Sequence, residues 1–168
     1  MMIRNALPEE YELIRNQRVE AYRQYAEVLP EGHWRALRRA ISSDADKQAG
    51  VELIVAEIEG SITGSVALFP AKTNAYGQLL DALDYPEIRM LAVSPEHRGK
   101  GIAATLVREC IYRSEAQGFR TIGLHTGEFM KPAMNLYEKL GFERVPEYDF
   151  QPADDGITVK AFRFSMKD

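Results

Sequence analysis

The sequence predicts an α+β domain with a mixed β-sheet. Glu52–Glu59 and Ile62–Phe69 are rich in apolar and β-branched residues. Only the pair Gly60-Ser61 separates them, which is typical of a β-hairpin and therefore of antiparallel pairing. Further along, the strand-like run Glu87–Val93 is followed by a helical segment and then by another strand-like run, Arg120–Thr126. A hairpin combined with such a crossover indicates a mixed sheet.

Helical periodicity and chain-breaking residues predict the remaining elements. Apolar residues at helical spacing indicate a first helix that begins at Pro8 and ends near Pro30, and Gly141 marks the end of the last helix. The other expected elements, in chain order, are a strand over Ile3–Leu7, a helix over His33–Ile41, a polar loop over Ser42–Gly50, helices over Gly101–Ala116 and Pro132–Leu140, and strands over Phe142–Tyr148 and Ile157–Met166. The sheet is thus expected to be mostly antiparallel, with six or seven strands and about four helices.

Length and composition favour one domain over residues 1–168. The net charge of −4 and the pI of about 5.5 argue against a nucleic-acid partner. The basic cluster Arg35, Arg38 and Arg39 is expected to be a solvated helix face. Cys110 lies in an apolar helical stripe and is expected in the core, and as a single cysteine it fits a reducing compartment.

The N-terminus, Met1–Asn5, has no apolar stretch of signal-peptide length. No run approaches the roughly 18 apolar residues of a membrane span. We therefore expect a cytoplasmic protein without a membrane partner. No cluster of His, Cys and carboxylate residues has metal-ligand spacing, so no metal is expected.

The strongest functional pattern is the segment Val93–Ala103, where a strand ends, a loop turns and a helix begins. The first amides of a helix have no internal partner, and the helix dipole places partial positive charge there. Glycines allow a phosphate to approach the backbone closely, and Arg98 and Lys100 add charge. The segment therefore predicts a site for a pyrophosphate.

Two other phosphate-binding patterns fit this segment less well. A Walker loop requires Ser or Thr after its lysine, but Gly101 follows Lys100. A dinucleotide fingerprint is formally present as Gly99, Gly101 and Ala104. Its glycines normally follow the strand almost directly, whereas Ser94–Arg98 intervene here.

The sequence resembles the GNAT superfamily of N-acetyltransferases over Ile88–Phe142. Arg98–Ala103 (RGKGIA) matches the signature Arg/Gln-x-x-Gly-x-Gly/Ala of that family. Leu91–Pro95 resembles the family's fourth strand, and Ala133–Phe142 is similar to its Ala-x-x-Leu-Tyr-Glu-Lys-x-Gly-Phe segment. One helix and one strand separate the two motifs, as the family requires.

The resemblance implies the acyl-CoA N-acyltransferase fold, in which a bulge in the fourth strand splays two central strands apart. It also implies acetyl-CoA as cosubstrate, a primary amine of a small molecule or protein as acceptor, and an acetyltransferase activity. A homodimer is the default expectation for such enzymes. The implied cofactor-binding residues are Leu91, Ala92 and Val93 for the pantetheine arm and Arg98, Gly99, Lys100, Gly101, Ile102 and Ala103 for the pyrophosphate.

Attack of an amine on a thioester needs a base, an oxyanion donor and a proton for the leaving thiolate. Tyr137 matches the family tyrosine assigned to the last role; the alternative is a packing tyrosine. In the family, a glutamate on the fourth strand, a few residues before the bulge, often serves as the base directly or through water. Glu87, six residues before Val93, resembles that glutamate and is the candidate base; the alternative is a surface carboxylate at a strand end. His125, or a water chain, could also be the base.

One position departs from the family pattern. Met130 stands where many members carry an asparagine that contacts the pantetheine arm. This departure motivates an alternative function as a non-catalytic acyl-CoA-binding module. A further expectation concerns the segment Pro70–Pro86, in which Tyr76, Asp81 and Asp84 could form part of an acidic mouth for a cationic amine.

Overall fold

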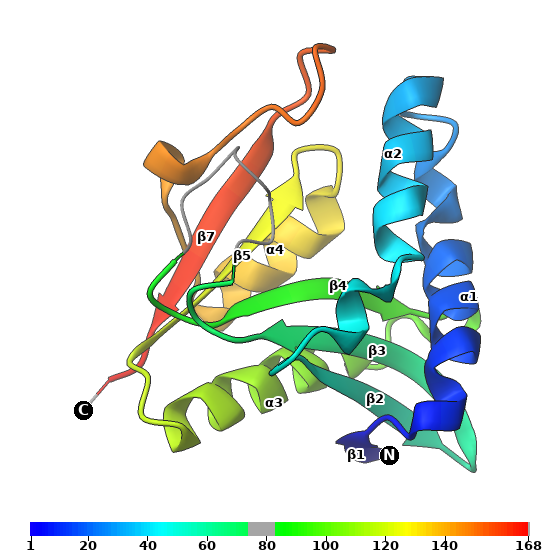
Figure 1. Cartoon of the computed structure of the whole chain (residues 1–168), viewed down its shortest axis with the longest axis vertical. Coiled ribbons are helices and arrows are strands. Elements are labelled where there is room, and N and C mark those ends of the chain that lie inside the picture. Colours follow the sequence, from blue (N-terminus) through cyan, green and yellow to red (C-terminus); the bar gives the residue numbers. More distant parts are fainter. Residues whose placement is uncertain (74–82, 168) are drawn as a thin grey trace. The chain divides into compact units, whose positions relative to one another are not determined.

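A computed structural model describes residues 1–73 and 83–167 of the chain (Figure 1). The chain divides into two compact units, of which the first comprises 1–68 and 90–109 and the second 69–89 and 110–168. The strands are β1 (Met2–Asn5), β2 (Glu52–Ile58), β3 (Ser61–Phe69), β4 (Glu87–Val93), β5 (Thr121–Gly127), β6 (Glu143–Arg144) and β7 (Val159–Ser165). The α-helices are α1 (Tyr11–Tyr22), α2 (Glu31–Ile41), α3 (Ile102–Ala116) and α4 (Lys131–Leu140). Both β4 and α3 contribute residues to each unit.

The strands form one seven-stranded sheet in the order β1-β2-β3-β4-β5-β7-β6. β1 pairs with β2, β2 with β3, β5 with β7 and β6 with β7 in antiparallel fashion, whereas β4 and β5 are parallel. These pairings confirm the predicted mixed, mostly antiparallel sheet, and the predicted four helices accompany it in the described part of the chain.

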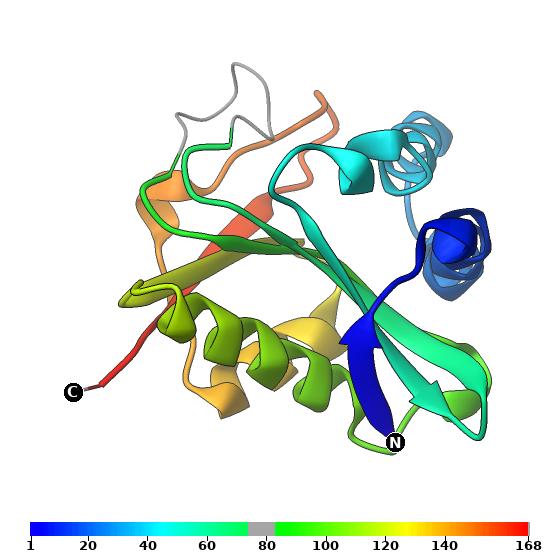
Figure 2. The ribbon, with the colours of Figure 1, turned by 60° about the horizontal axis from the view of Figure 1, so that its bottom comes forward.

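In the first unit, the helices α1 and α2 lie side by side, as both views of the ribbon show (Figures 1 and 2). Helix α3 packs closely on strand β3 at Gly64. A Cβ there would lie 3.1 Å from Cγ2 of Ile102 and 3.3 Å from Cδ1 of Leu106. Gly64 therefore lets the start of α3, which carries the predicted pyrophosphate loop, approach the sheet.

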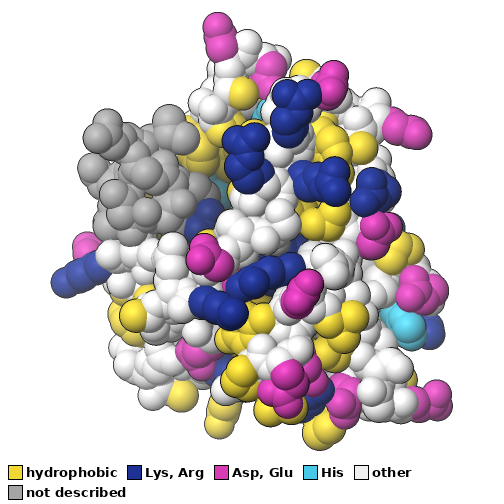
Figure 3. Space-filling model, turned by 45° about the vertical axis from the view of Figure 1, so that its right-hand side comes forward, with side chains coloured by type: hydrophobic (Ala, Val, Ile, Leu, Met, Phe, Trp, Pro, Cys, Tyr) yellow, Lys and Arg dark blue, Asp and Glu magenta, His cyan; other side chains and the backbone are white. Residues whose placement is uncertain are grey.

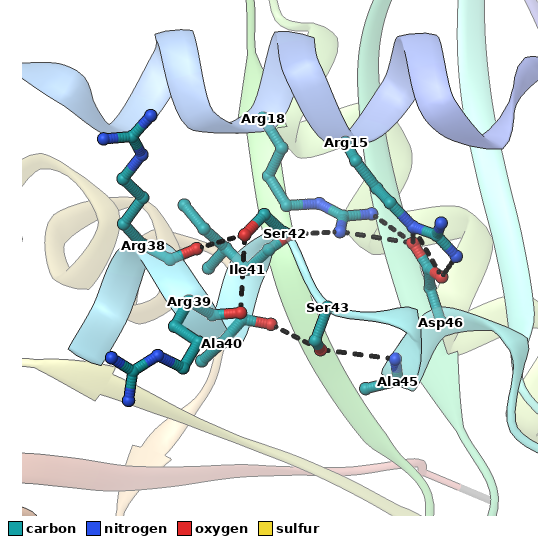
Figure 4. Close-up of polar contacts among 10 residues, drawn as sticks. All are labelled: Arg15, Arg18, Arg38, Arg39, Ala40, Ile41, Ser42, Ser43, Ala45 and Asp46. Atoms are coloured by element: carbon teal, nitrogen blue, oxygen red, sulfur yellow. Dashed lines mark hydrogen bonds and ion pairs between the residues drawn. The ribbon is translucent and has the colours of Figure 1, made fainter. Parts of the chain in front are cut away.

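A buried ionic network ties α1 to the segment after α2 (Figure 4). Arg18 and Asp46 are both fully buried, and both terminal nitrogens of Arg18 lie 3.3 Å from Oδ2 of Asp46. Arg18 also donates to the carbonyl of Ile41 at 2.7 Å, and Arg15 donates to Oδ1 of Asp46 at 2.6 Å. The predicted polar loop Ser42–Gly50 thus holds a buried carboxylate, on a 3₁₀ turn that Ser43 caps.

In the second unit, α4 packs against β7 through aromatic side chains. The Tyr137 ring centroid lies 5.8 Å from that of Phe142 and 6.2 Å from that of Phe162. Phe142 in turn contacts Phe164, with centroids 5.5 Å apart. Gly141 ends α4 in the left-handed conformation at φ 103°, as predicted from its position.

Two predicted elements are wrong in extent. The first helix ends at Tyr22 and continues as a 3₁₀ turn over Arg23–Tyr25, so that the apolar spacing persists after regular hydrogen bonding stops. The predicted strand Phe142–Tyr148 shrinks to β6, because Pro146, which has no amide hydrogen, opens a 3₁₀ turn.

The remaining structural expectations for single side chains are confirmed. Cys110 is fully buried. Arg35, Arg38 and Arg39 are exposed on α2, and Lys and Arg side chains gather on the face that carries this helix (Figure 3). Within the described parts of the chain, no helix combines the length and the apolar character needed to cross a membrane.

Candidate functional site

The predicted phosphate loop connects the 3₁₀ turn Pro95–His97 to α3 through two left-handed glycines. Gly99 and Gly101 both have φ 78°, a conformation that other residues adopt only with strain. A Cβ at either position would meet nothing within 4 Å. The backbone conformation, rather than crowding, therefore requires glycine here, and the space beside both residues is open to a ligand.

A run of amides at the start of α3 has no hydrogen-bond partner among the described residues. The structure records no hydrogen bond from the amides of residues 99–104 to a described residue, and the first helical bond is donated by Thr105 to Gly101 at 3.1 Å. Unpaired amides at a helix N-terminus bind anions. The Arg98 amide, by contrast, donates to the carbonyl of Pro95 at 3.3 Å. The available donors thus begin at Gly99, one residue later than predicted.

The guanidinium of Arg98 is directed toward the end of α1. Its Nη2 donates to the carbonyl of Ala21 at 2.9 Å, and its Nη1 lies 3.4 Å from Oε1 of Gln24. The side chain therefore braces the loop against α1 in addition to supplying charge. Lys100 is exposed.

Strand β4 carries an irregularity at Met90, whose φ is 58°. A left-handed residue interrupts the regular pleat of a strand, and positive φ is uncommon for a residue with a Cβ. Directly after it, the carbonyl of Leu91 accepts a hydrogen bond from the hydroxyl of Tyr22 at 2.9 Å. Ala92 is buried and Val93 is half-buried. The irregularity lies just before the stretch predicted to bind pantetheine.

In the second unit, the candidate base Glu87 is buried and contacts His125. Oε2 of Glu87 lies 2.8 Å from Nδ1 of His125, and the two side chains are 8% and 1% exposed. Nε2 of His125 lies 3.2 Å from the carbonyl oxygen of Tyr148. Glu87 is therefore not the exposed strand-end carboxylate of the alternative interpretation, and two of the three candidate bases are one hydrogen-bonded pair.

Aromatic rings surround this pair. The ring of Phe150 packs edge-on against His125, with centroids 5.6 Å apart. Gly123, which is paired with Glu87 in the sheet, leaves room for Tyr85, because a Cβ on Gly123 would collide with the Tyr85 ring. Burial raises the pKa of Tyr85 from 10.0 to about 12, and the nearby Glu87 adds to this effect.

The raised pKa of Tyr85 predicts a loss of stability at alkaline pH. The unfolded chain releases this proton near pH 10.0 and the folded chain near pH 12, so stability present below pH 10.0 is lost as the pH rises through this window. Tyr85→Phe should lose less stability between these pH values than the natural protein in denaturant titrations. Tyr112→Phe, at a tyrosine that is 67% exposed, is the matched control. Equal losses in natural protein and Tyr85→Phe would contradict the prediction.

Tyr137, the candidate proton donor, is 6% exposed and lies in the aromatic cluster of α4.

Met130, which stands where the family carries an asparagine, forms the N-cap of the same helix without a capping side-chain bond. Its Sδ lies 3.5 Å from Oγ1 of Thr126. Asn135 is exposed. Nothing in these contacts replaces the amide that Met130 lacks.

Several partners of the site carried no recognisable sequence signal. Tyr148 contributes a backbone carbonyl, which any residue could supply. Gly123 matters because the Tyr85 ring lies against it. Neither residue is part of a sequence motif.

The predicted acidic mouth is described only in part. Tyr76 and Asp81 lie outside the described residues, and Asp84 is exposed. Among the described residues, no cluster of three or more His, Cys, Asp or Glu side chains could hold a metal ion.

The loop at the start of α3, the irregular strand β4 and the order of elements are those expected of the acyl-CoA N-acyltransferase fold. The model of the acetyltransferase (GNAT) family matches residues 8–142, and the chain belongs to this family. The resemblance seen in the two motifs is thereby confirmed.

Curated relatives and solved structures agree with this assignment. The chain is 33% identical over 111 residues to N-acetyltransferase family 8 member 2 of Rattus norvegicus, which is 66% of this chain and 47% of that protein. The probable N-acetyltransferase family 8 member 5 of Mus musculus is 36% identical over 94 residues, covering 56% of this chain and 39% of that protein. The chain thus matches less than half the length of these relatives.

Two crystal structures match over nearly the full length of both chains. A GNAT-family acetyltransferase from Staphylococcus aureus has a TM-score of 0.73 at 14% identity and covers 99% of each chain. The PaiA N-acetyltransferase from Thermoplasma acidophilum, solved in complex with coenzyme A, has a TM-score of 0.70 at 16% identity and covers 98% of each chain. At these identities the likeness concerns the fold.

Proposed function

We propose that this chain is an acetyl-CoA-dependent N-acetyltransferase that transfers the acetyl group directly to a primary amine of a small molecule or a protein. The observation that carries the proposal is the row of amides at the start of α3, which includes two left-handed glycines and has no hydrogen-bond partner among residues 1–73 and 83–167. This row suits the pyrophosphate of CoA. Membership of the GNAT family supports the same cosubstrate.

In this proposal the loop at the start of α3 and the end of β4 hold the cofactor. The amides of Gly99, Lys100, Gly101, Ile102 and Ala103 bind the pyrophosphate, and Lys100 and Arg98 neutralise its charge. The backbone of Leu91, Ala92 and Val93 pairs with the pantetheine arm, as an added strand would. The left-handed Met90 before this stretch supports the assignment, because such an irregularity interrupts regular strand pairing.

Glu87 and Tyr137 are the proposed catalytic side chains. Glu87 accepts the proton that the attacking amine must lose, and burial beside His125 holds its carboxylate in one orientation. Tyr137 gives a proton to the departing CoA thiolate. The reaction needs no metal in this scheme.

Thermal unfolding with acetyl-CoA tests the cofactor assignment. A ligand that binds only the folded chain stabilises it by about 2.7 kcal/mol at roughly 100 times its Kd. We expect a higher Tm with acetyl-CoA but not with NAD or ATP. No shift at about 1 mM acetyl-CoA, the upper end of ordinary KM values, would overturn the proposal.

Lys100→Ala sharpens this test. It removes an exposed charge beside the proposed pyrophosphate, and we expect the Kd for acetyl-CoA to rise roughly tenfold. Arg39→Ala removes an exposed charge from α2 and is the matched control, with an unchanged Kd. An equal rise in Kd in both variants would show that the overall charge of the protein, rather than the loop at α3, attracts acetyl-CoA.

Met130 favours a second candidate function, an acyl-CoA-binding module without catalysis. The thioether of Met130 cannot donate the hydrogen bond that an amide side chain offers to the pantetheine arm. This candidate predicts the same thermal shift but no release of free thiol with any amine. Thiol release on screening polyamines, amino acids and peptide amines would exclude it.

The wider assignments belong to the same proposal. The acceptor amine is the expected partner, and we expect a homodimer, which size-exclusion chromatography with light scattering can test. The single buried Cys110 suits a reducing compartment such as the cytoplasm.

A further inference from the structure

Two contacts of the His125 ring nitrogens constrain the protons that it shares with Glu87. A carbonyl oxygen only accepts hydrogen bonds, so the contact between Nε2 and the Tyr148 carbonyl oxygen at 3.2 Å is a hydrogen bond only when Nε2 carries a proton. The contact between Nδ1 and Oε2 of Glu87 at 2.8 Å needs a second proton. That proton lies either on Nδ1, with an ionised Glu87 carboxylate, or on Oε2, with a neutral His125 ring whose Nδ1 accepts the hydrogen bond.

Removing this second proton breaks one of the two contacts. If Nε2 keeps its hydrogen, the lone pair of Nδ1 faces the carboxylate. If Nδ1 takes the hydrogen, the lone pair of Nε2 faces the carbonyl of Tyr148. Both side chains are nearly inaccessible to water, at 1% and 8% exposure, so solvent does not compensate for the lost contact.

We propose that Glu87 and His125 act as one proton-holding unit, in which His125 is a positioning residue that sets when Glu87 can accept a proton. The unit rests with the proton shared between Nδ1 and Oε2 and with Nε2–H donated to Tyr148. It becomes a base only after the shared proton has left to solvent. This inference rests on the proposed function for its catalytic part alone.

The reaction then balances without another reactant. The neutral amine attacks the thioester carbon, the new C–N bond forms, and the C–S bond breaks. The proton lost by the amine nitrogen enters the depleted unit and becomes the shared proton again. Tyr137 protonates the thiolate and regains its proton from solvent, so an amine and acetyl-CoA give an amide and CoA thiol.

Nuclear magnetic resonance of the histidine rings tests the proton inventory without any substrate. The chain has 3 histidines, so His33→Asn and His97→Asn assign the signals of His125. We expect a protonated Nε2 and a slowly exchanging, strongly downfield proton that disappears in both Glu87→Gln and His125→Asn. A neutral ring with its hydrogen on Nδ1 and a bare Nε2 would overturn the inference.

Two substitutions of His125 distinguish a residue that shares a proton with Glu87 from one that only holds the Glu87 carboxylate in place. The amide nitrogen of asparagine takes the place of Nδ1, so His125→Asn can still donate to Glu87, whereas His125→Ala cannot. We expect kcat to fall roughly 100-fold in both variants, with an unchanged KM for acetyl-CoA. If His125→Asn restored the kcat that His125→Ala loses, His125 would be only a structural support and the inference would fail.

The two arms distinguish this inference from the proposed function. A chain that neither binds nor turns over acetyl-CoA, yet shows the shared proton, would contradict the proposed function and leave the proton inventory intact. A chain that acetylates amines but shows an Nε2 without a proton would support the proposed function and contradict the proton inventory. Thermal stability of each variant, measured alongside, shows whether it is folded.

Discussion

Asp46→Ala is expected to lower the free energy of unfolding by about 3–5 kcal/mol, which corresponds to a fall in Tm of roughly 6–20 °C. Asp46 is the only carboxylate that contacts Arg18 among the described residues, and both side chains are fully buried. Burial lowers the pKa of Arg18, and the charge of Asp46 opposes this effect. Without Asp46, a buried cation keeps only its bond to the carbonyl of Ile41, while its Nε–H already lacks a partner.

Denaturant titration of three variants checks this expectation. Asp44→Ala removes an exposed carboxylate from the same 3₁₀ turn and should change stability by less than about 0.5 kcal/mol. In Arg18→Met/Asp46→Leu, both buried charges are replaced by apolar groups, and we expect most of the stability to return. A loss below about 1 kcal/mol in Asp46→Ala would mean that water or rearrangement satisfies Arg18.

The order of elements could be predicted because each strand and helix is marked by local chemistry. Gly60 marks a hairpin, although the turn is Glu59-Gly60 rather than the predicted Gly60-Ser61. Gly141 ends α4, and the glycines of the RGKGIA segment mark the loop at α3. Each depends on a backbone conformation that few residues tolerate. The two family motifs lie in these same segments, which is why the family could be recognised from residues alone.

Contacts between distant segments could not be predicted in the same way. Asp46 is one acidic residue among several in a polar stretch, and only folding brings it to Arg18, 28 residues away. The pairing of Glu87 with His125 needs two parallel strands in one particular register. The carbonyl that contacts Nε2 of His125 belongs to Tyr148, in a segment that was predicted to be a strand.

Tyr137 has two candidate roles, proton donor to the thiolate and packing residue of α4. Only the first role requires the phenolic oxygen, so removing that atom distinguishes them. Its ring packs against the rings of Phe142 and Phe162, with centroids 5.8 and 6.2 Å away. Phenylalanine at this position preserves the ring and its burial. A packing role therefore survives the change, whereas a proton donor for the thiolate is lost.

Tyr137→Phe is accordingly expected to lower kcat roughly 100-fold or more, with the Kd for acetyl-CoA and the Tm nearly unchanged. The measurement is thiol release under saturating acetyl-CoA, together with thermal unfolding with and without the ligand. Tyr112→Phe, at an exposed tyrosine on α3, is the matched control and should keep full activity. If kcat stayed unchanged in Tyr137→Phe, the tyrosine would be a packing residue, since a general acid in the transition state cannot be removed without slowing the step that it assists. A parallel fall in kcat, affinity and Tm would likewise place its role in the structure of α4 rather than in proton transfer.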